Sequence, residues 1–247
     1  MNKVEKEKAL KLLVQERRDT EMGGAYDGYL NISDVAPEFD NDSYGYEYCI
    51  TPISKGACNV EASVMVILND WISTEGVDKV NTAGLMKSLI SNGRITTGVG
   101  ALKTCMSLRA TARTNSYLDK DIIENHLNMR RQDVYITNAF PFVKSGGMCS
   151  NKSNKAIKEA SHFFVKQVEI VQPKLILILG TPAKQVFDIC SSNSEWSVSG
   201  LDVNTSVLIT EKFQSSVCFM PHPTVYSQNK DAWCGDEFKN RVIMSII

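Results

Sequence analysis

The sequence predicts an α/β protein, with three α/β/α layers around a mainly parallel central sheet. Four short apolar runs are bounded by polar or turn residues, as buried strands of a parallel sheet are; they span residues 64–68, 134–136, 175–179 and 217–220. Longer segments between these runs repeat apolar residues at helical spacing. Strands that alternate with helices form right-handed β-α-β units, which place helices on both faces of the sheet.

The helices are predicted from apolar spacing and from their end signals. The first, residues 4–17, carries a broad apolar stripe formed by Val4, Ala9, Leu10, Leu12, Leu13 and Val14. A second begins near Ser153 or Asn154 and ends before Pro173, and a third opens at Thr181-Pro182, with proline in its first turn. Further helices are expected at residues 77–91, 121–128 and 235–247, and a further short strand at residues 207–210.

The chain has 247 residues, of which 43% are hydrophobic and 22% charged, as in an ordinary globular protein. We expect one domain over residues 1–247, in which residues 1–55 form an N-terminal helix and a loop-rich arm. The formal net charge of −1 gives no global basic field, although residues 94–131 are locally basic. No apolar run approaches the roughly 18 residues of a membrane span, and the N-terminus lacks a secretory signal. A cytoplasmic protein without a membrane partner is therefore expected, and we also expect a monomer.

The seven cysteines are an odd number, and none of them forms a C-x-x-C pair. A disulfide framework is not expected in the cytoplasm. A metal or iron–sulfur site built from Cys49, Cys58 and Cys149 is conceivable, but the spacing matches no strong zinc pattern. We therefore expect no metal site at these cysteines.

Polar residues follow each of the four predicted strands. Asn69-Asp70, Thr137-Asn138 and Gly180-Thr181 follow the first three strands, and His222 follows the last, between two prolines. Ligands of open α/β sheets bind at the carboxyl ends of the strands. We therefore expect Asp70, Asn138 and His222 to meet at one edge of the sheet.

Each of these side chains has a functional and a structural interpretation. Asp70 could position or activate a water molecule, or it could cap a helix or turn. Asn138 offers donors and an acceptor suited to the edge of a pyrimidine, or it could form a turn. His222, its backbone restricted by the flanking prolines, could donate to an oxygen that gains negative charge, or it could be structural.

The segment after His222 favours the functional interpretation. Thr224 and Ser227 carry short hydroxyl groups suited to phosphate contacts, and Tyr226 places a large ring on the same turn.

In these segments the chain resembles the uracil-DNA glycosylase superfamily. The similarity covers about residues 62–227 in order, and four short segments carry it: residues 64–70, 134–138, 173–183 and 222–227. The last of them, His-Pro-Thr-Val-Tyr-Ser, is similar to the family's His-Pro-Ser/Thr loop.

The resemblance implies a compact α/β/α fold that binds a flipped nucleotide of single- or double-stranded DNA in a pocket at the strand ends. It also implies cleavage of the N-glycosidic bond without a metal or redox cofactor. Asp70 would position water and stabilise the cationic sugar, Asn138 would read the base, and His222 would stabilise the departing base anion. Tyr226 would fill the gap left by the flipped base, and Thr224 and Ser227 would hold phosphates.

The chain departs from the family around its first motif, which here reads Leu-Asn-Asp-Trp-Ile over residues 68–72. Ile72 stands where the family has an aromatic residue that blocks the 5-position of the base. No aromatic residue occurs between Ile72 and Ser116, where the family usually supplies a stacking ring, so Trp71, Phe140 or Phe142 would stack instead. We therefore expect Asn69, Trp71, Ile72, Asn138 and Phe140 to contact the base.

The resulting hypothesis is a DNA glycosylase acting on uracil or on a 5-modified cytosine of the kind found in phage DNA. Its role, in base excision repair or in antiviral defence, stays open. One alternative is a catalytically inactive module of the same fold that binds nucleic acid or a nucleotide. Another is an unrelated flavodoxin-like enzyme, although Gly180-Thr181-Pro182 is too sparse for a phosphate-binding loop.

Overall fold

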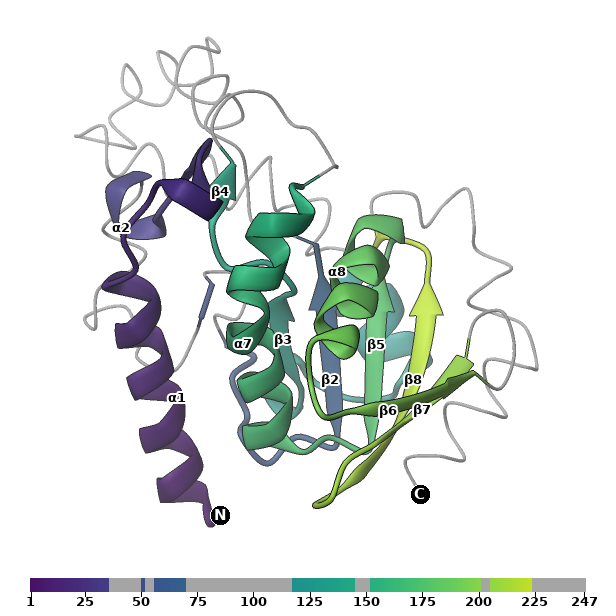
Figure 1. The fold of residues 1–247 in the computed structure, drawn as a ribbon. Helices are drawn as coiled ribbons and strands as arrows, with labels where there is room; N and C mark the ends of the chain where they lie inside the picture. The colour runs from purple at the N-terminus through teal and green to yellow at the C-terminus, as the bar shows by residue number, and fades with distance from the viewer. Residues whose placement is uncertain (36–49, 52–55, 70–116, 145–151, 201–204, 224–247) are drawn as a thin grey trace, which may run out of the picture.

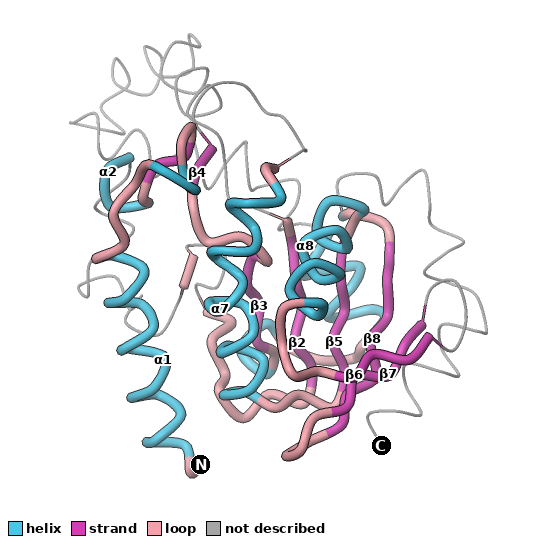
Figure 2. The backbone as a smooth tube through the Cα atoms, in the orientation of Figure 1, coloured by secondary structure: helices cyan, strands magenta, loops and turns pink. Residues whose placement is uncertain are grey.

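The computed structural model describes residues 1–35, 50–51, 56–69, 117–144, 152–200 and 205–223. Its centre is a six-stranded sheet with the strand order β3-β2-β5-β8-β7-β6 (Figures 1 and 2). The strands are β2 (Val64–Leu68), β3 (Tyr135–Asn138), β5 (Leu175–Leu179), β6 (Ser197–Gly200), β7 (Thr205–Ile209) and β8 (Gln214–Met220). The first four strands of this order are parallel, whereas β7 and β6 continue the sheet antiparallel.

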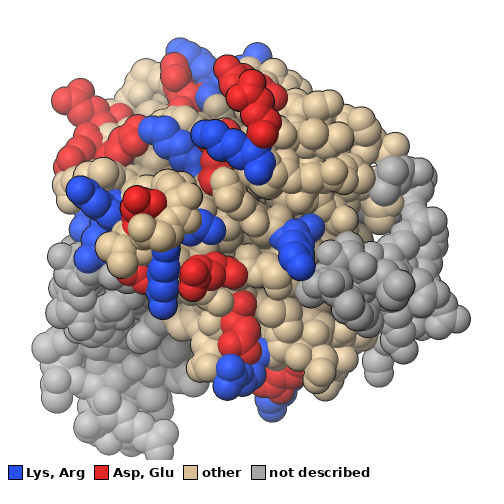
Figure 3. Space-filling view, turned by 90° about the horizontal axis from the view of Figure 1, so that it is seen from below, with Lys and Arg blue, Asp and Glu red and all other residues tan. Residues whose placement is uncertain are grey.

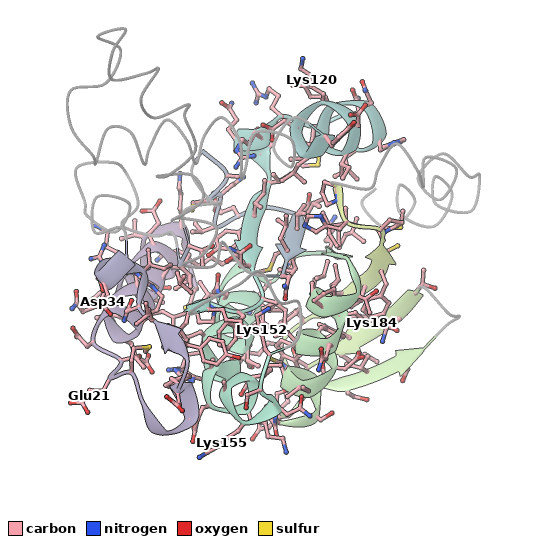
Figure 4. The ribbon with its side chains drawn as sticks, turned by 90° about the horizontal axis from the view of Figure 1, so that it is seen from above. Glu21, Asp34, Lys120, Lys152, Lys155 and Lys184 are labelled. Atoms are coloured by element: carbon pink, nitrogen blue, oxygen red, sulfur yellow. The ribbon has the colours of Figure 1, made fainter. Side chains whose placement is uncertain are left out.

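Helices cover both faces of the sheet. The helices α7 (Asn154–Val171) and α8 (Thr181–Ser192) lie on one face, and α1 (Lys3–Arg18) packs beside α7 (Figure 1). The π-helix η6 (Tyr117–His126), which carries Lys120, lies on the opposite face (Figure 4). The expected three-layer α/β/α arrangement with a mainly parallel sheet is confirmed.

Strands β2, β3 and β5 are buried throughout, and Ser215, Val217, Cys218 and Met220 are buried in β8; burial on both faces of the sheet explains the apolar runs. Successive side chains of β2 alternate between the two sides, as strand geometry requires. Met65 and Ile67 join the apolar cluster under α7 and α8, whereas Val64, Val66 and Leu68 join the cluster under η6.

The N-terminal helix is confirmed and one residue longer at each end than predicted. Asn2 accepts from the backbone N–H of Glu5, whose carboxylate accepts from the backbone N–H of Asn2, and this capping box starts the helix. The apolar stripe is narrower than predicted because Val4 and Leu12 point to solvent, with 72% and 64% of their surface exposed.

The other predicted elements agree to different degrees. Helix α7 and the start of α8 match their predictions, whereas η6 begins four residues before the expected residue 121. The amide of Leu127 donates to the carbonyl of Ile122, five residues earlier, at 3.0 Å, which is the π-helical pattern. The helices predicted at residues 77–91 and 235–247 lie outside the described residues.

The arm predicted to be loop-rich contains regular structure in its described part. A short helix η1 (Gly24–Tyr26) precedes β1 (Tyr29–Leu30) and α2 (Ile32–Val35). Strand β1 pairs antiparallel with β4 (Val143–Lys144), which is separated from the end of β3 by four residues. The short helix η7 (Arg131–Asp133) lies just before β3 in the sequence. The arm is therefore attached to the segment that leaves the carboxyl end of β3.

A buried polar contact fixes the arm to α1. Asn31, only 2% exposed, accepts from Arg17 Nη1 at 2.6 Å, and its Nδ2 donates to the backbone carbonyls of Arg17 and Arg18. Its amide thus caps the end of α1 and pairs with a fully buried guanidinium group.

Removing this amide should destabilise the fold. We expect Asn31→Ala to lower the free energy of unfolding by about 2 kcal/mol, because it leaves buried polar groups unpaired. That loss corresponds to a melting temperature about 4–8 °C lower in a thermal scan. The control is Asn193→Ala, which removes an exposed side-chain bond to the carbonyl of Ile189. Equal stability losses in both variants would contradict this assignment.

The cysteines depart from expectation in one respect. Cys58 is disulfide-bonded, although no disulfide framework was predicted. Cys49 and Cys149 lie outside the described residues. Cys190 and Cys218 are buried free thiols, and burial raises the pKa of each to about 12. None of the described helices combines the length and apolarity needed to span a bilayer.

Candidate functional site

The parallel strands bring the sequence-predicted polar positions to one edge of the sheet. In the pairing register, Leu68 of β2 lies beside Asn138 of β3, and Leu179 of β5 lies beside Met220 of β8. Strand β5 lies between β2 and β8. Across this edge the order is therefore Asn138, Asn69, Gly180 and then the residues that follow Met220.

Backbone hydrogen bonds continue beyond the ends of β2 and β3. The amide of Ala139 donates to the carbonyl of Leu68 at 2.7 Å, and the amide of Phe140 donates to the carbonyl of Asn69 at 3.0 Å. Asn69 and Asn138 are thus held on neighbouring chains by the backbone itself. Adjacent strands lie about 4.8 Å apart, so the backbones of Asn69 and Asn138 are close neighbours at this edge.

Asn138 is almost fully buried, with 1% of its surface exposed. Its Nδ2 donates to Oγ1 of Thr51 at 3.2 Å, and Thr51 is itself 1% exposed. Sequence reasoning missed Thr51, because it lies in a segment without strand or helix periodicity. A hydroxyl group can donate or accept, so this contact holds the position of the amide without dictating which of its ends faces outward.

Asn69 is held by a lysine that sequence reasoning also missed. Lys152, only 6% exposed, donates from Nζ to Oδ1 of Asn69 at 2.6 Å. The same ammonium group lies 5.6 Å from the centre of the Phe140 ring. Figure 4, which looks onto the carboxyl ends of the strands, shows Lys152 in the interior of the view, whereas Lys155 and Lys120 lie at its margin.

His222 lies against Gly180, the residue that connects β5 to α8. Gly180 has a φ of +91°, which favours glycine, and its amide donates to the carbonyl of Met220 at 2.8 Å. A Cβ atom built at Gly180 would lie 3.1 Å from Cβ of His222. The absence of a side chain at position 180 therefore allows the half-buried imidazole to lie close to the N-terminus of α8.

Phe140 is brought to this edge by its backbone, but its ring lies in the core. The side chain is 1% exposed and packs against Tyr29 and Phe142, with ring centres 5.1 and 5.8 Å away. Phe142 is also 1% exposed and lies against Tyr26 and Phe163. A stacking role for Phe140 stays a prediction.

Several predicted site residues lie outside the described residues: Asp70, Trp71, Ile72, Thr224, Tyr226 and Ser227. Asp70 directly follows Asn69, and Thr224 directly follows Pro223, so their sequence neighbours belong to this edge. Within the described ranges, no group of three His, Cys, Asp or Glu side chains is arranged to hold a metal ion.

The opposite end of the molecule differs in character. Figure 3 views the described residues from the amino ends of the parallel strands, and Lys and Arg are interspersed there with Asp and Glu. Among the described residues, this face shows no continuous basic stripe of the kind that follows a phosphate backbone.

The carboxyl edge can recognise a small polar heterocycle. Two side-chain amides supply donors and acceptors, and an imidazole two strands from Asn69 supplies a further donor or acceptor. The first turn of α8 adds the positive end of a helix dipole beside the imidazole. Such a set of groups can stabilise negative charge on a planar ring.

A family model matches the chain. The model of the uracil DNA glycosylase superfamily matches residues 101–244, which is more than half of the chain and includes Asn138, Lys152, Gly180 and His222. The search of curated proteins found no match. The family match agrees with the mostly parallel α/β/α sheet and with the polar carboxyl edge, and we conclude that the chain belongs to the uracil DNA glycosylase superfamily.

Proposed function

We propose that this protein is a DNA glycosylase that hydrolyses the N-glycosidic bond of a flipped pyrimidine, either uracil or a 5-modified cytosine. Membership in the superfamily supports glycosylase-like chemistry on DNA. The observation that carries the proposal is the alignment of Asn138, Asn69, Gly180 and His222 along one edge of the parallel sheet.

The reaction separates a sugar cation from a base anion, so preorganised charge determines its rate. His222 would donate to a base oxygen as that oxygen gains negative charge, and the N-terminus of α8 favours the same charge. Asp70, which follows Asn69 directly, would stabilise the cationic sugar and position the attacking water. Asn138 would read the polar edge of the base.

The sequence around the first motif supports a base larger than uracil. In the alignment that the motif suggests, Ile72 stands where the family carries an aromatic residue beside the 5-position. A smaller side chain there would admit a substituent at that position. A 5-hydroxymethyl or glycosylated cytosine is the type of base that such a pocket would accept.

The proposal is tested by incubating the full chain with oligonucleotides that carry one uracil, one thymine or one 5-modified cytosine, each single-stranded and paired. Alkali then cuts at abasic sites, and gel electrophoresis measures the cleaved fraction. We expect excision of uracil, a modified cytosine or both. Binding to these oligonucleotides without cleavage would instead indicate an inactive binding module. If the protein neither binds nor cleaves any of them, the proposal is wrong.

The close approach of Gly180 and His222 gives a second test. We expect Gly180→Ala to reduce single-turnover excision about tenfold to a hundredfold, because a methyl group at a φ of +91° strains the turn and displaces the imidazole. Gly200→Ala is the matched control, because no atom lies within 4 Å of the added methyl group there. Equal excision by the two variants would show that the position of His222 does not limit the reaction.

A further inference from the structure

We propose that Lys152 is a positioning residue that fixes the side-chain amide of Asn69, so that Asn69 presents N–H donors to a carbonyl oxygen of the bound base. The inference rests on the proposed function for the nature of the ligand. The geometry that supports it is independent of that function.

The direction of the Asn69 amide follows from the chemistry of lysine. An ammonium group has three donors and no acceptor, so the end of an amide that faces it must be the carbonyl oxygen. The bond from Lys152 Nζ to Asn69 Oδ1 is 2.6 Å long, slightly shorter than the roughly 2.7–2.9 Å of charge-assisted N–H···O bonds. Nδ2 of Asn69 is then the end left for a ligand, and it has no hydrogen-bond partner among the described residues.

The lysine itself is held in place from both sides. The backbone amide of the next residue, Ser153, donates to the hydroxyl of Tyr29 at 3.0 Å. The Tyr29 ring packs against Phe140, over whose face the Lys152 ammonium lies. A nearly buried lysine with these neighbours cannot follow the ligand as a surface lysine would, so its effect must pass through the groups that it contacts.

The side-chain amides of Asn69 and Asn138 therefore differ in which of their ends can face a ligand. Asn138 contacts Thr51, whose hydroxyl can donate or accept, so its amide can present either end to a base. Asn69 can present only donors. All natural pyrimidines carry a carbonyl oxygen at position 2, whereas the group at position 4 differs between uracil and cytosine. A fixed donor suits the constant oxygen, and an adaptable amide suits the variable group.

A polarised donor also contributes to the rate. Hydrogen bonds in a chain strengthen one another, so the Lys152 cation makes the Asn69 N–H groups better donors. Their bond to the base strengthens as the base becomes an anion, and only such a change accelerates the chemical step. Loss of Lys152 should therefore lower kcat more than it raises KM.

The first measurement needs no activity. The side-chain NH₂ signal of Asn69 is identified in a ¹⁵N–¹H spectrum of the full chain by its absence in Asn69→Asp. We expect Lys152→Met to shift it, and we expect Lys155→Met, which removes an exposed charge three residues away, to leave it unchanged. If Lys152→Met does not fold, Lys152→Arg is compared with Lys155→Arg in the same way. An unshifted Asn69 signal in the variant at position 152 overturns the proposal.

The second measurement is a double-mutant cycle on excision. Lys152→Met should lower kcat about tenfold to a hundredfold, Lys152→Arg should recover part of the loss, and Lys155→Met should stay near the wild type. In an Asn69→Ala background, Lys152→Met should change kcat less than about twofold, because the partner is already gone. Equal losses in both backgrounds would mean that Lys152 acts directly on the DNA, which overturns the proposal. A wild type that excises no base contradicts the proposed function alone, and the NMR result then decides the role of Lys152.

Discussion

His222→Ala is expected to lower single-turnover excision about 10²–10³-fold, the usual cost of removing one preorganised electrostatic partner. The imidazole follows β8 and lies against Gly180 at the start of α8, so its position is set by the sheet and by a glycine. Affinity for the oligonucleotide should fall far less, because the bond to the departing oxygen strengthens only in the transition state. Excision is measured with enzyme in excess over an oligonucleotide that the wild type cleaves.

The control for this substitution is His162→Ala. His162 lies on α7, where its Nε2 is 3.0 Å from Oε1 of Glu16 and its side chain is 38% exposed, so its partner is a surface carboxylate rather than a group of the carboxyl edge. The His162→Ala substitution should therefore leave the rate of excision near that of the wild type. Wild-type turnover by His222→Ala would remove the histidine from the mechanism.

Asp70→Asn should produce a loss of similar size, about 10²–10³-fold in single-turnover excision. The carboxylate directly follows Asn69, and asparagine keeps its shape while removing the charge that stabilises the sugar cation. Binding to the same oligonucleotide, measured by fluorescence anisotropy, should change little. The pairing of lost turnover with retained binding is what separates a catalytic carboxylate from a capping one.

Asp188→Asn serves as the control for the loss of a carboxylate. Asp188 is exposed on α8 and pairs with Lys184, one turn earlier, at 2.8 Å. Exposed pairs of this kind contribute little, so excision should not change. If Asp70→Asn behaves like this control, the proposed role of Asp70 is wrong.

The parallel strands could be predicted because burial on both faces leaves a clear mark in the sequence. The run Leu-Ile-Leu-Ile-Leu of residues 175–179 has no polar interruption, and all five side chains are buried in β5. The ends of such runs are equally visible, which is why Asp70, Asn138 and His222 were expected at one edge; of these, Asp70 lies outside the described residues. The fold class followed from this one type of signal, and so did the expectation that Asn138 and His222 lie at the same edge.

Other elements have no comparable pattern of apolar residues in the sequence. Strand β6 reads Ser-Val-Ser-Gly and is exposed throughout, so only its pairing with β7 makes it a strand. Strands β1 and β4 have two residues each and depend on one another. Val4 and Leu12 were assigned to the buried stripe of α1 because hydrophobic spacing does not show which part of a stripe the neighbouring helix covers.

The two missed site residues show the same limit at the level of single side chains. Thr51 and Lys152 each lie beside a strand end only through tertiary contacts with Asn138 and Asn69, 87 and 83 residues away. Neither belongs to a periodic segment or a motif. A short polar stretch just before α7 was the only sequence signal near Lys152, and such stretches are common at helix starts.

The strand order also bears on how the protein is made. Strand β8, the last described strand in the sequence, inserts between β5 and β7 rather than adding to an edge. The six-stranded sheet cannot form until residues 214–220 have left the ribosome. The edge that carries Asn138 and Gly180 therefore lacks His222 until the end of synthesis. A nascent chain lacking that strand would hold no assembled edge, so the proposed excision of a base would require a chain that has finished folding.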